Sequence, residues 1–165
     1  MSNTCNSIVN LFTTCKKATN DDDLKAIEIL ATIIDSQSHS AIDLDVYEND
    51  EEGREQLESD FSEIFEAVEE IATHLGEDDF YLEFDGNEYR LIHDDAIWQI
   101  YVDEIKSIVG DCYDLKLDDI PDFIAWEIDW EQTAKNAHAD GYGHTFSSYD
   151  HSEQECNGYY IFRTN

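Results

Sequence analysis

The sequence predicts an α+β fold with several amphipathic helices, short antiparallel hairpins and a highly acidic surface. Long segments repeat apolar residues at helical spacing, and an Asp-Gly pair separates two short alternating segments. The charge is extreme, because 40 Asp and Glu stand against 9 Lys and Arg in 165 residues, a formal net charge of -31. Hydrophobic residues make up 41% of the chain and aromatic residues 12%, which excludes a disordered acidic tail.

The length suits one domain, residues 1–165, with enough apolar material for a core. A subdivision into a helical part (1–76) and a mixed part (77–165) is left open as an alternative.

In the first half, apolar residues three and four apart predict helices at residues 4–17, 21–36 and 50–75. Asn20 or Asp21 is a suitable N-cap for the second helix, and Gly76 is a natural stop for the third. Between these helices, Ala41–Tyr47 alternates apolar and acidic residues, which predicts a short strand.

In the second half, a hairpin is expected from Phe80–Phe84 and Glu88–His93, joined at Asp85-Gly86-Asn87, because Asp-Gly favours a tight turn. Helices are expected at residues 94–109, in a short segment around Pro121, and at Asp129–Asp140. Thr145–Tyr149 and Tyr159–Arg163 are expected to form a C-terminal hairpin or strand pair.

Known catalytic and metal-binding patterns do not fit the sequence. A calcium loop starting at Glu48 would place Gly53 correctly at position 6, but position 12 is Ser59 instead of a bidentate Glu. His144, His151 and Cys156 match no usual zinc spacing. Because no nucleophile, phosphate loop or metalloprotease motif is present either, we expect no catalytic residue, no metal and no cofactor.

Several features indicate a cytoplasmic protein without membrane contact. No apolar run reaches the ~20 residues of a membrane helix, and the first 17 residues lack the pattern of a signal peptide. The cysteines are scattered and are expected to be reduced thiols: Cys5, Cys15, Cys112 and Cys156.

The acidic residues are concentrated between Asp43 and Glu88, where 19 acids accompany one base, Arg54. On the helix expected at 50–75, acids three or four residues apart recur every ~5 Å along one exposed face. Such a row approaches the charge spacing of duplex DNA, in which phosphates recur every ~3.4 Å along each strand. The predicted DNA-mimicking face comprises Asp50, Glu51, Glu52, Glu55, Glu58, Glu63, Glu66, Glu69, Glu70, Glu77, Asp78 and Asp79.

These observations favour an inhibitor without enzymatic activity, which occupies the basic DNA groove of a host defence nuclease and does not itself bind nucleic acid. The first target is a restriction-modification enzyme, and a CRISPR effector or another DNA-binding protein is an alternative. Three other hypotheses remain open. The protein is an acidic chaperone for basic nucleoid proteins, or an enzyme with an unrecognised carboxylate site, or its charge serves only solubility or adaptation to salt.

The C-terminal third carries a resemblance over about 45 of 165 residues. Its elements are Ile128-Asp129-Trp130-Glu131, then Thr133-Ala134, then Asp140-Gly141-Tyr142-Gly143-His144. This part resembles the ends of acidic phage and plasmid antirestriction proteins of the ArdA type. The resemblance implies an elongated, acidic α+β protein from a mobile element, often dimeric, that occupies the DNA site of type I restriction-modification enzymes.

Aromatic residues are densest in the same C-terminal region, which is also less acidic, with four acids and two bases from Gln132 to Asn165. We expect these side chains to fill a core or the interface of a homodimer. The residues are Trp126, Trp130, Tyr142, Phe146, Tyr149, Tyr159, Tyr160 and Phe162.

Overall fold

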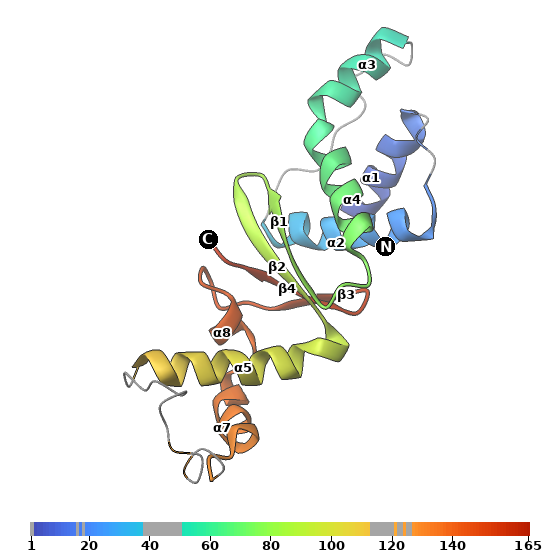
Figure 1. The fold of residues 1–165 in the computed structure, drawn as a ribbon. Coiled ribbons are helices and arrows are strands. Elements are labelled where there is room, and N and C mark those ends of the chain that lie inside the picture. Colours follow the sequence, from blue (N-terminus) through green and yellow to red (C-terminus); the bar gives the residue numbers. More distant parts are fainter. Residues whose placement is uncertain are drawn as a thin grey trace.

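A four-stranded antiparallel sheet lies between two groups of helices, which confirms the predicted α+β class (Figure 1). The strand order is β1-β2-β4-β3. The strands are β1 (Asp79–Phe84), β2 (Asn87–His93), β3 (Gln154–Cys156) and β4 (Tyr159–Arg163). This computed structural model describes residues 2–15, 17, 19–37, 51–112, 121, 124 and 127–165. The strand expected at Ala41–Tyr47 and most of the helix expected around Pro121 lie outside the described residues.

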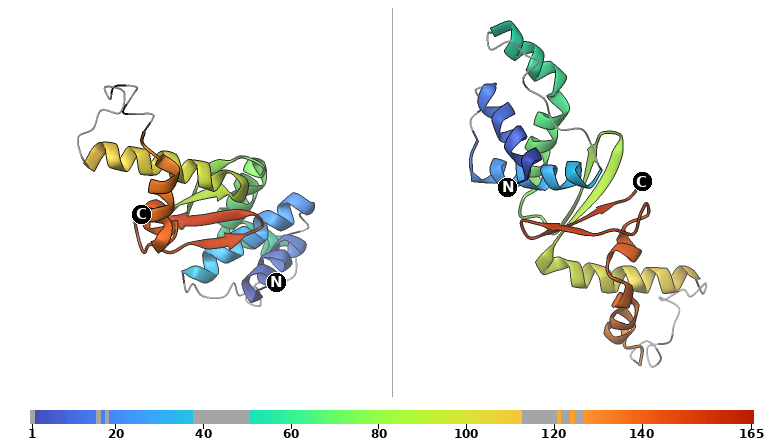
Figure 2. Two further views of the ribbon diagram at one scale, coloured as in Figure 1. Left: turned by 90° about the horizontal axis from the view of Figure 1, so that it is seen from below. Right: turned by 180° about the vertical axis from the view of Figure 1, so that it is seen from behind.

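The helices form two groups on opposite sides of the sheet, and the view from behind shows the same three layers (Figures 1 and 2). One group consists of α1 (Asn3–Thr14), α2 (Asp21–Ser36), α3 (Glu51–Asp60) and α4 (Ser62–His74). The other consists of α5 (Asp94–Cys112), α7 (Trp130–Ala137), the 3-10 turn η2 (His138–Asp140) and α8 (Gly143–Phe146).

Helix α2 is the central helix of the first group and packs against α1, α4 and β3. Its start is fixed by Asn20, whose side-chain oxygen accepts hydrogen bonds from the backbone N–H groups of Asp22 and Asp23. The Asp23 carboxylate accepts from the Asn20 N–H in return, which completes a capping box. The predicted cap at Asn20 is therefore confirmed.

The sheet carries a separate apolar core on each face, because successive residues of a strand point to opposite sides. On one face, Leu82, Leu91 and Ile161 pack with α1, α2 and α4. On the other face, Ile92 and Phe162 pack with α5, α7 and α8. Two cores that share one sheet bury most of the large apolar side chains among the described residues, which offsets the self-repulsion of a chain this acidic.

The single helix predicted for residues 50–75 is wrong, because the chain breaks into α3 and α4 at Phe61. Phe61 has φ -113° and ψ 22°, outside the helical region, and its carbonyl oxygen accepts from both Ile64 N and Phe65 N. The apolar stripe continues across the break, with Leu57 before it and Ile64 after it both buried in the same core. A periodic pattern cannot reveal such a one-residue interruption.

The predicted first hairpin is confirmed, but the C-terminal strand pair is partly wrong. Asp85 and Gly86 have φ values of 51° and 68°, as the two central residues of a type I′ turn require. In contrast, the strand expected at Thr145–Tyr149 is absent, because Gly143–Phe146 forms helix α8 and Gln154–Cys156 pairs with β4 instead. Ser147 then leaves the helix and its hydroxyl donates to the Arg163 carbonyl oxygen.

The helices of the second half follow the expected pattern with small differences. Asp129 caps α7 by accepting from the Gln132 N–H, and Gly141 ends the following turn with φ 84°. On α5, Tyr101 and Ile105 are buried, whereas Ile108 is 41% exposed although its spacing from Ile105 would place it on the inward side. Five of the aromatic residues expected in a core or an interface pack in the core beneath α5: Trp130, Tyr142, Phe146, Tyr160 and Phe162. Tyr159 lies in the other core, Tyr149 is exposed, and Trp126 lies outside the described residues.

The close approach of two segments at Gly143 gives a test of this packing. A Cβ atom at Gly143 would lie 2.1 Å from the His151 carbonyl oxygen, so Gly143→Ala forces the backbone apart and should lower the free energy of unfolding by about 3 kcal/mol. Gly86→Ala is the control, because no atom lies within 4 Å and the change brings only the strain of its positive φ, about 1 kcal/mol. Urea unfolding of both variants measures the difference, and equal losses would contradict the close packing at α8.

Candidate functional site

Exposed carboxylates cover the outer surface of α3 and α4, as the sequence predicts. All of the following are exposed: Glu51, Glu52, Glu55, Glu58, Glu63, Glu66, Glu69, Glu70, Glu77 and Asp78. Asp79 is only partly exposed, and Asp50 lies outside the described residues. The structure thus brings ten of the twelve predicted positions to the surface of one continuous stretch of chain.

The local sequence explains why the acids share one side of α4. Its apolar residues at helical spacing are buried against α2 and the sheet, among them Ile64, Val68 and Ile71. Glu66, Glu69 and Glu70 occupy the opposite positions of the same turns and therefore point to solvent. Helix α3 is even more exposed than α4, since Leu57 is its only buried residue. The helix extends away from the sheet at one end of the molecule (Figure 1).

Three of the predicted site residues already have partners within the fold. The Glu63 carboxylate accepts from the Asp85 N–H at 2.5 Å, which connects α4 to the hairpin turn. His74 Nδ1 lies 3.0 Å from Glu77 Oε1. Asp79 binds Arg90 through two contacts, of 3.0 Å to Nε and 2.8 Å to Nη2. These carboxylates contribute to local structure as well as to charge.

The Asp79–Arg90 pair is a structural ion pair and not a free surface charge. Burial acts to lower the pKa of Arg90, but the hydrogen bonds and the charge of Asp79 outweigh it and raise that pKa. The guanidinium also lies over the rings of Tyr81 and Phe146. Asp79 is therefore neutralised in place and is less available to a partner than its neighbours.

The remaining predicted carboxylates on α3 and α4 form what we call the acidic array: Glu51, Glu52, Glu55, Glu58, Glu66, Glu69 and Glu70. Within the described ranges, none of their side-chain carboxylates forms a hydrogen bond or an ion pair. Their charges are thus directed at solvent without internal compensation. Such an arrangement destabilises the isolated chain slightly and attracts a surface of opposite charge.

A hollow of about 390 Å³ lies beside the array, between α4 and the connection from α1 to α2. Asp22, Asp23 and Glu69 line it together with the apolar side chains of Phe12 and Phe65. Lys17 lies over the Phe65 ring at 4.2 Å. The hollow therefore combines carboxylates with apolar surface.

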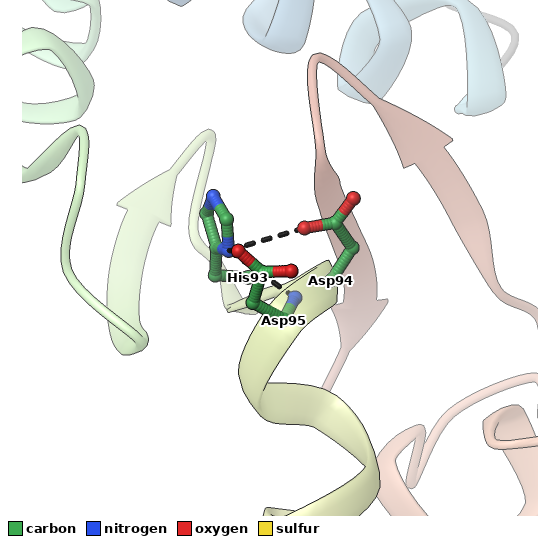
Figure 3. Close-up of side chains that lie close together, drawn as sticks. All are labelled: His93, Asp94 and Asp95. Atoms are coloured by element: carbon green, nitrogen blue, oxygen red, sulfur yellow. Dashed lines mark hydrogen bonds and ion pairs between the residues drawn. The ribbon is translucent and has the colours of Figure 1, made fainter.

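A histidine and two aspartates meet where β2 ends and α5 begins (Figure 3). His93 Nδ1 lies 3.1 Å from Asp94 Oδ1 and accepts from the Asp95 N–H at 3.3 Å. Although their ligand atoms lie within 4.8 Å of one another, Asp95 is 93% exposed and the start of α5 presents the positive end of its helix dipole. That end disfavours a cation, so we assign His93 to capping the first turn of α5.

The histidines and cysteine weighed as zinc ligands are not brought together. His144 and His151 stack with ring centroids 4.9 Å apart. Cys156 lies on the other side of the sheet, beside Glu28 and Thr32 of α2. Burial raises the pKa of the Cys156 thiol, which opposes the thiolate that a metal would need.

Sequence reasoning missed one polar site, a cavity on the α2 side of the sheet lined by Tyr89, Gln154 and Arg163. No sequence signal identifies it, because these residues come from three strands and meet only through the pairing of β2 with β4 and of β4 with β3.

Comparison of the chain with protein-family models, curated proteins and solved structures gives no match. The resemblance of the C-terminal third to ArdA-type proteins therefore stays a prediction. Over the described ranges, the structure contains no helix of the length and apolarity that crossing a membrane requires.

The role of Asp79 is testable apart from the acidic array. Asp79→Asn weakens a partly buried ion pair and should lower the free energy of unfolding by about 1.5 kcal/mol. Glu83→Gln on the same strand is the control, since Glu83 is exposed, and it should change stability by less than about 0.5 kcal/mol. Chemical denaturation of both variants checks the difference, and an unaffected Asp79→Asn variant would place Asp79 among the free surface charges.

Proposed function

We propose that this protein is a DNA-mimic inhibitor that occupies the DNA-binding groove of a host defence nuclease in the bacterial cytoplasm, with a restriction-modification enzyme as the first target. The observation that carries the proposal is the acidic array, whose uncompensated charges lie on the exposed sides of α3 and α4. A groove that has evolved to bind phosphates presents Lys and Arg at regular intervals, and a matching row of carboxylates competes for them.

The dimensions of the two helices suit such a groove. With a rise of ~1.5 Å per residue, α3 (10 residues) and α4 (13 residues) measure ~15 Å and ~20 Å. Together they span at most ~35 Å, about one turn of duplex DNA. Within α3, steps of four and three residues separate Glu51, Glu55 and Glu58 by ~6 Å and ~4.5 Å, which is one to two phosphate steps along a strand.

The architecture supports a binding role because α3 contributes little to the core. A helix that buries a single large side chain, Leu57, and exposes five carboxylates is poorly suited to stabilising the fold. The break at Phe61 also gives α3 a direction different from that of α4, so the array is not confined to one straight line. Inhibition of this kind needs no catalytic residue or cofactor, and the same charge repels nucleic acid.

A homodimer would extend the array, and the proposal allows but does not need one. The aromatic residues that suggested an interface are mostly accounted for by the core beneath α5.

Competition with DNA tests the proposed mechanism. The protein and duplex DNA should exclude each other from a type I restriction-modification enzyme, because both use the same basic groove. The affinity should fall about tenfold or more between about 50 mM and 200 mM salt. Gel competition at both salt concentrations measures this.

The outcomes of that competition separate the alternatives. Simultaneous binding of DNA and this protein to one enzyme molecule would contradict mimicry. Equal, loose binding to histone-like nucleoid proteins would instead favour an acidic chaperone. Exclusion of DNA from a CRISPR effector, with no binding to the restriction enzyme, would keep the mechanism and change the target.

Removing charge from each helix separately tests which helix contacts the target enzyme. Two triple variants each remove three charges and relieve repulsion between neighbouring carboxylates. The α3 variant carries Glu51→Gln, Glu55→Gln and Glu58→Gln, and the α4 variant carries Glu66→Gln, Glu69→Gln and Glu70→Gln. Stability should hold or rise by about 0.5 kcal/mol. Inhibition should weaken about tenfold, as expected for the loss of three solvent-exposed ion pairs.

The matched control removes three exposed acids from the opposite side of the sheet: Asp111→Asn, Glu127→Gln and Glu155→Gln. This variant has the same net charge as each triple variant and differs only in where the charges are removed. It should retain inhibition, because the acidic array is intact. Inhibition constants that depend only on net charge, and not on its position, would refute the acidic array as the contact surface.

A further inference from the structure

A polar cavity of about 200 Å³ lies on the α2 side of the sheet, and it is separate from the acidic array. Its floor is formed by β2, β3 and β4, one wall by the last turn of α2, and its rim by the loop that precedes β3. The lining residues are Ile33, Ser36, Gln37, Tyr89, Tyr149, Asp150, Ser152, Gln154, Ile161 and Arg163.

Strand register explains why distant residues line the same space. Tyr89 on β2 is the direct partner of Arg163 on β4, and Gln154 on β3 is the partner of Ile161 on β4. Directly opposite residues of antiparallel strands project from the same face of a sheet. All four side chains therefore project toward the end of α2.

Two buried polar atoms in this lining have no partner within the described part of the chain. Tyr89 is only 2% exposed, and its hydroxyl forms no hydrogen bond. The Gln154 Oε1 atom is likewise buried without a donor. Burial raises the pKa of Tyr89, so its hydroxyl stays protonated and can donate. Buried polar groups are nearly always satisfied, so an unsatisfied pair that lines a cavity is available to hydrogen-bond a polar ligand.

The cavity also has one charged group of each sign. Arg163 is held in place by the Tyr149 ring, 3.7 Å from the guanidinium carbon, and by donation from Nε to the Asn165 carbonyl oxygen at 2.7 Å. Asp150 Oδ1 accepts from the Ser147 hydroxyl and from the Ser152 N–H and hydroxyl. Burial acts to raise the pKa of Asp150, but these hydrogen bonds outweigh it and lower the pKa, so Asp150 is a carboxylate at neutral pH.

We propose that this cavity binds a free α-amino acid, whose carboxylate faces Arg163 and the Tyr89 hydroxyl and whose ammonium group faces Asp150 and Gln154 Oε1. The volume equals that of about seven waters at ~30 Å³ each, enough for a small solute of this kind. A net anion such as a phosphate compound is disfavoured by the protein charge of -31, whereas a zwitterion has no net charge to repel. Apolar ligands find only Ile33 and Ile161 among the aliphatic lining residues.

The first experiment titrates the full chain, labelled with nitrogen-15, with each standard α-amino acid at millimolar concentration. At least one should cause saturable shifts in the amide signals of Tyr89, Gln154 and Arg163. Butylamine and butyrate, which each carry only one of the two charges, should not. The proposal is overturned if no amino acid gives saturable shifts at these residues, or if the singly charged compounds give the same shifts.

A conservative variant tests the unpartnered hydroxyl. Tyr89→Phe keeps the ring and removes only the hydroxyl, so the fold should persist while the affinity for the bound amino acid falls about tenfold. Tyr81→Phe is the control, because Tyr81 is 50% exposed outside the cavity, and it should bind like the wild type. Wild-type affinity in a folded Tyr89→Phe variant would overturn the proposal. This site does not depend on the DNA-mimic proposal, and inhibition assays do not enter its test.

Discussion

The antiparallel pairing of β2 with β4 is the constraint on which the rest of the structure depends. It joins residues 89–93 to residues 159–163, so the middle of the chain and its C-terminal segment meet in one sheet. Alternation along these strands places Leu91 and Ile161 in one core and Ile92 and Phe162 in the other. Closing so long a loop has an entropic cost, and burial on both faces of the same strands offsets it. Tyr159 reinforces the junction, because its hydroxyl accepts from the Gly76 N–H at 2.6 Å and contacts the Glu77 carbonyl oxygen.

This arrangement explains how the chain tolerates its charge. Apolar side chains are concentrated in two cores, one on each face of the sheet. The acidic array lies on the exposed sides of α3 and α4, and α3 extends away from the sheet (Figure 1). Repulsion between exposed carboxylates is screened by water and salt, whereas the same charges within either core would be prohibitive. Helix α3 buries only Leu57 and exposes five carboxylates, which is why we propose that it contacts an external partner.

Local chemistry in the sequence predicts much of the fold and of the array. Asn20 identifies the start of α2, Asp85-Gly86 identifies the hairpin, and helical periodicity predicts the exposed side of α4. The break at Phe61 escapes this reasoning because the apolar stripe resumes in phase on the far side. The polar cavity beside α2 escapes it for another reason, since Tyr89 and Gln154 meet only through strand register, which depends on the whole sheet.

The central claim is that the acidic array is the surface that contacts the target enzyme. Carbodiimide labelling of carboxylates, read by mass spectrometry with and without a purified type I restriction-modification enzyme, tests it most directly. The account predicts that Glu51, Glu55, Glu58, Glu66, Glu69 and Glu70 become protected in the complex, while Asp111, Glu127 and Glu155 remain reactive. Protection of the second set with continued labelling of the first would contradict it.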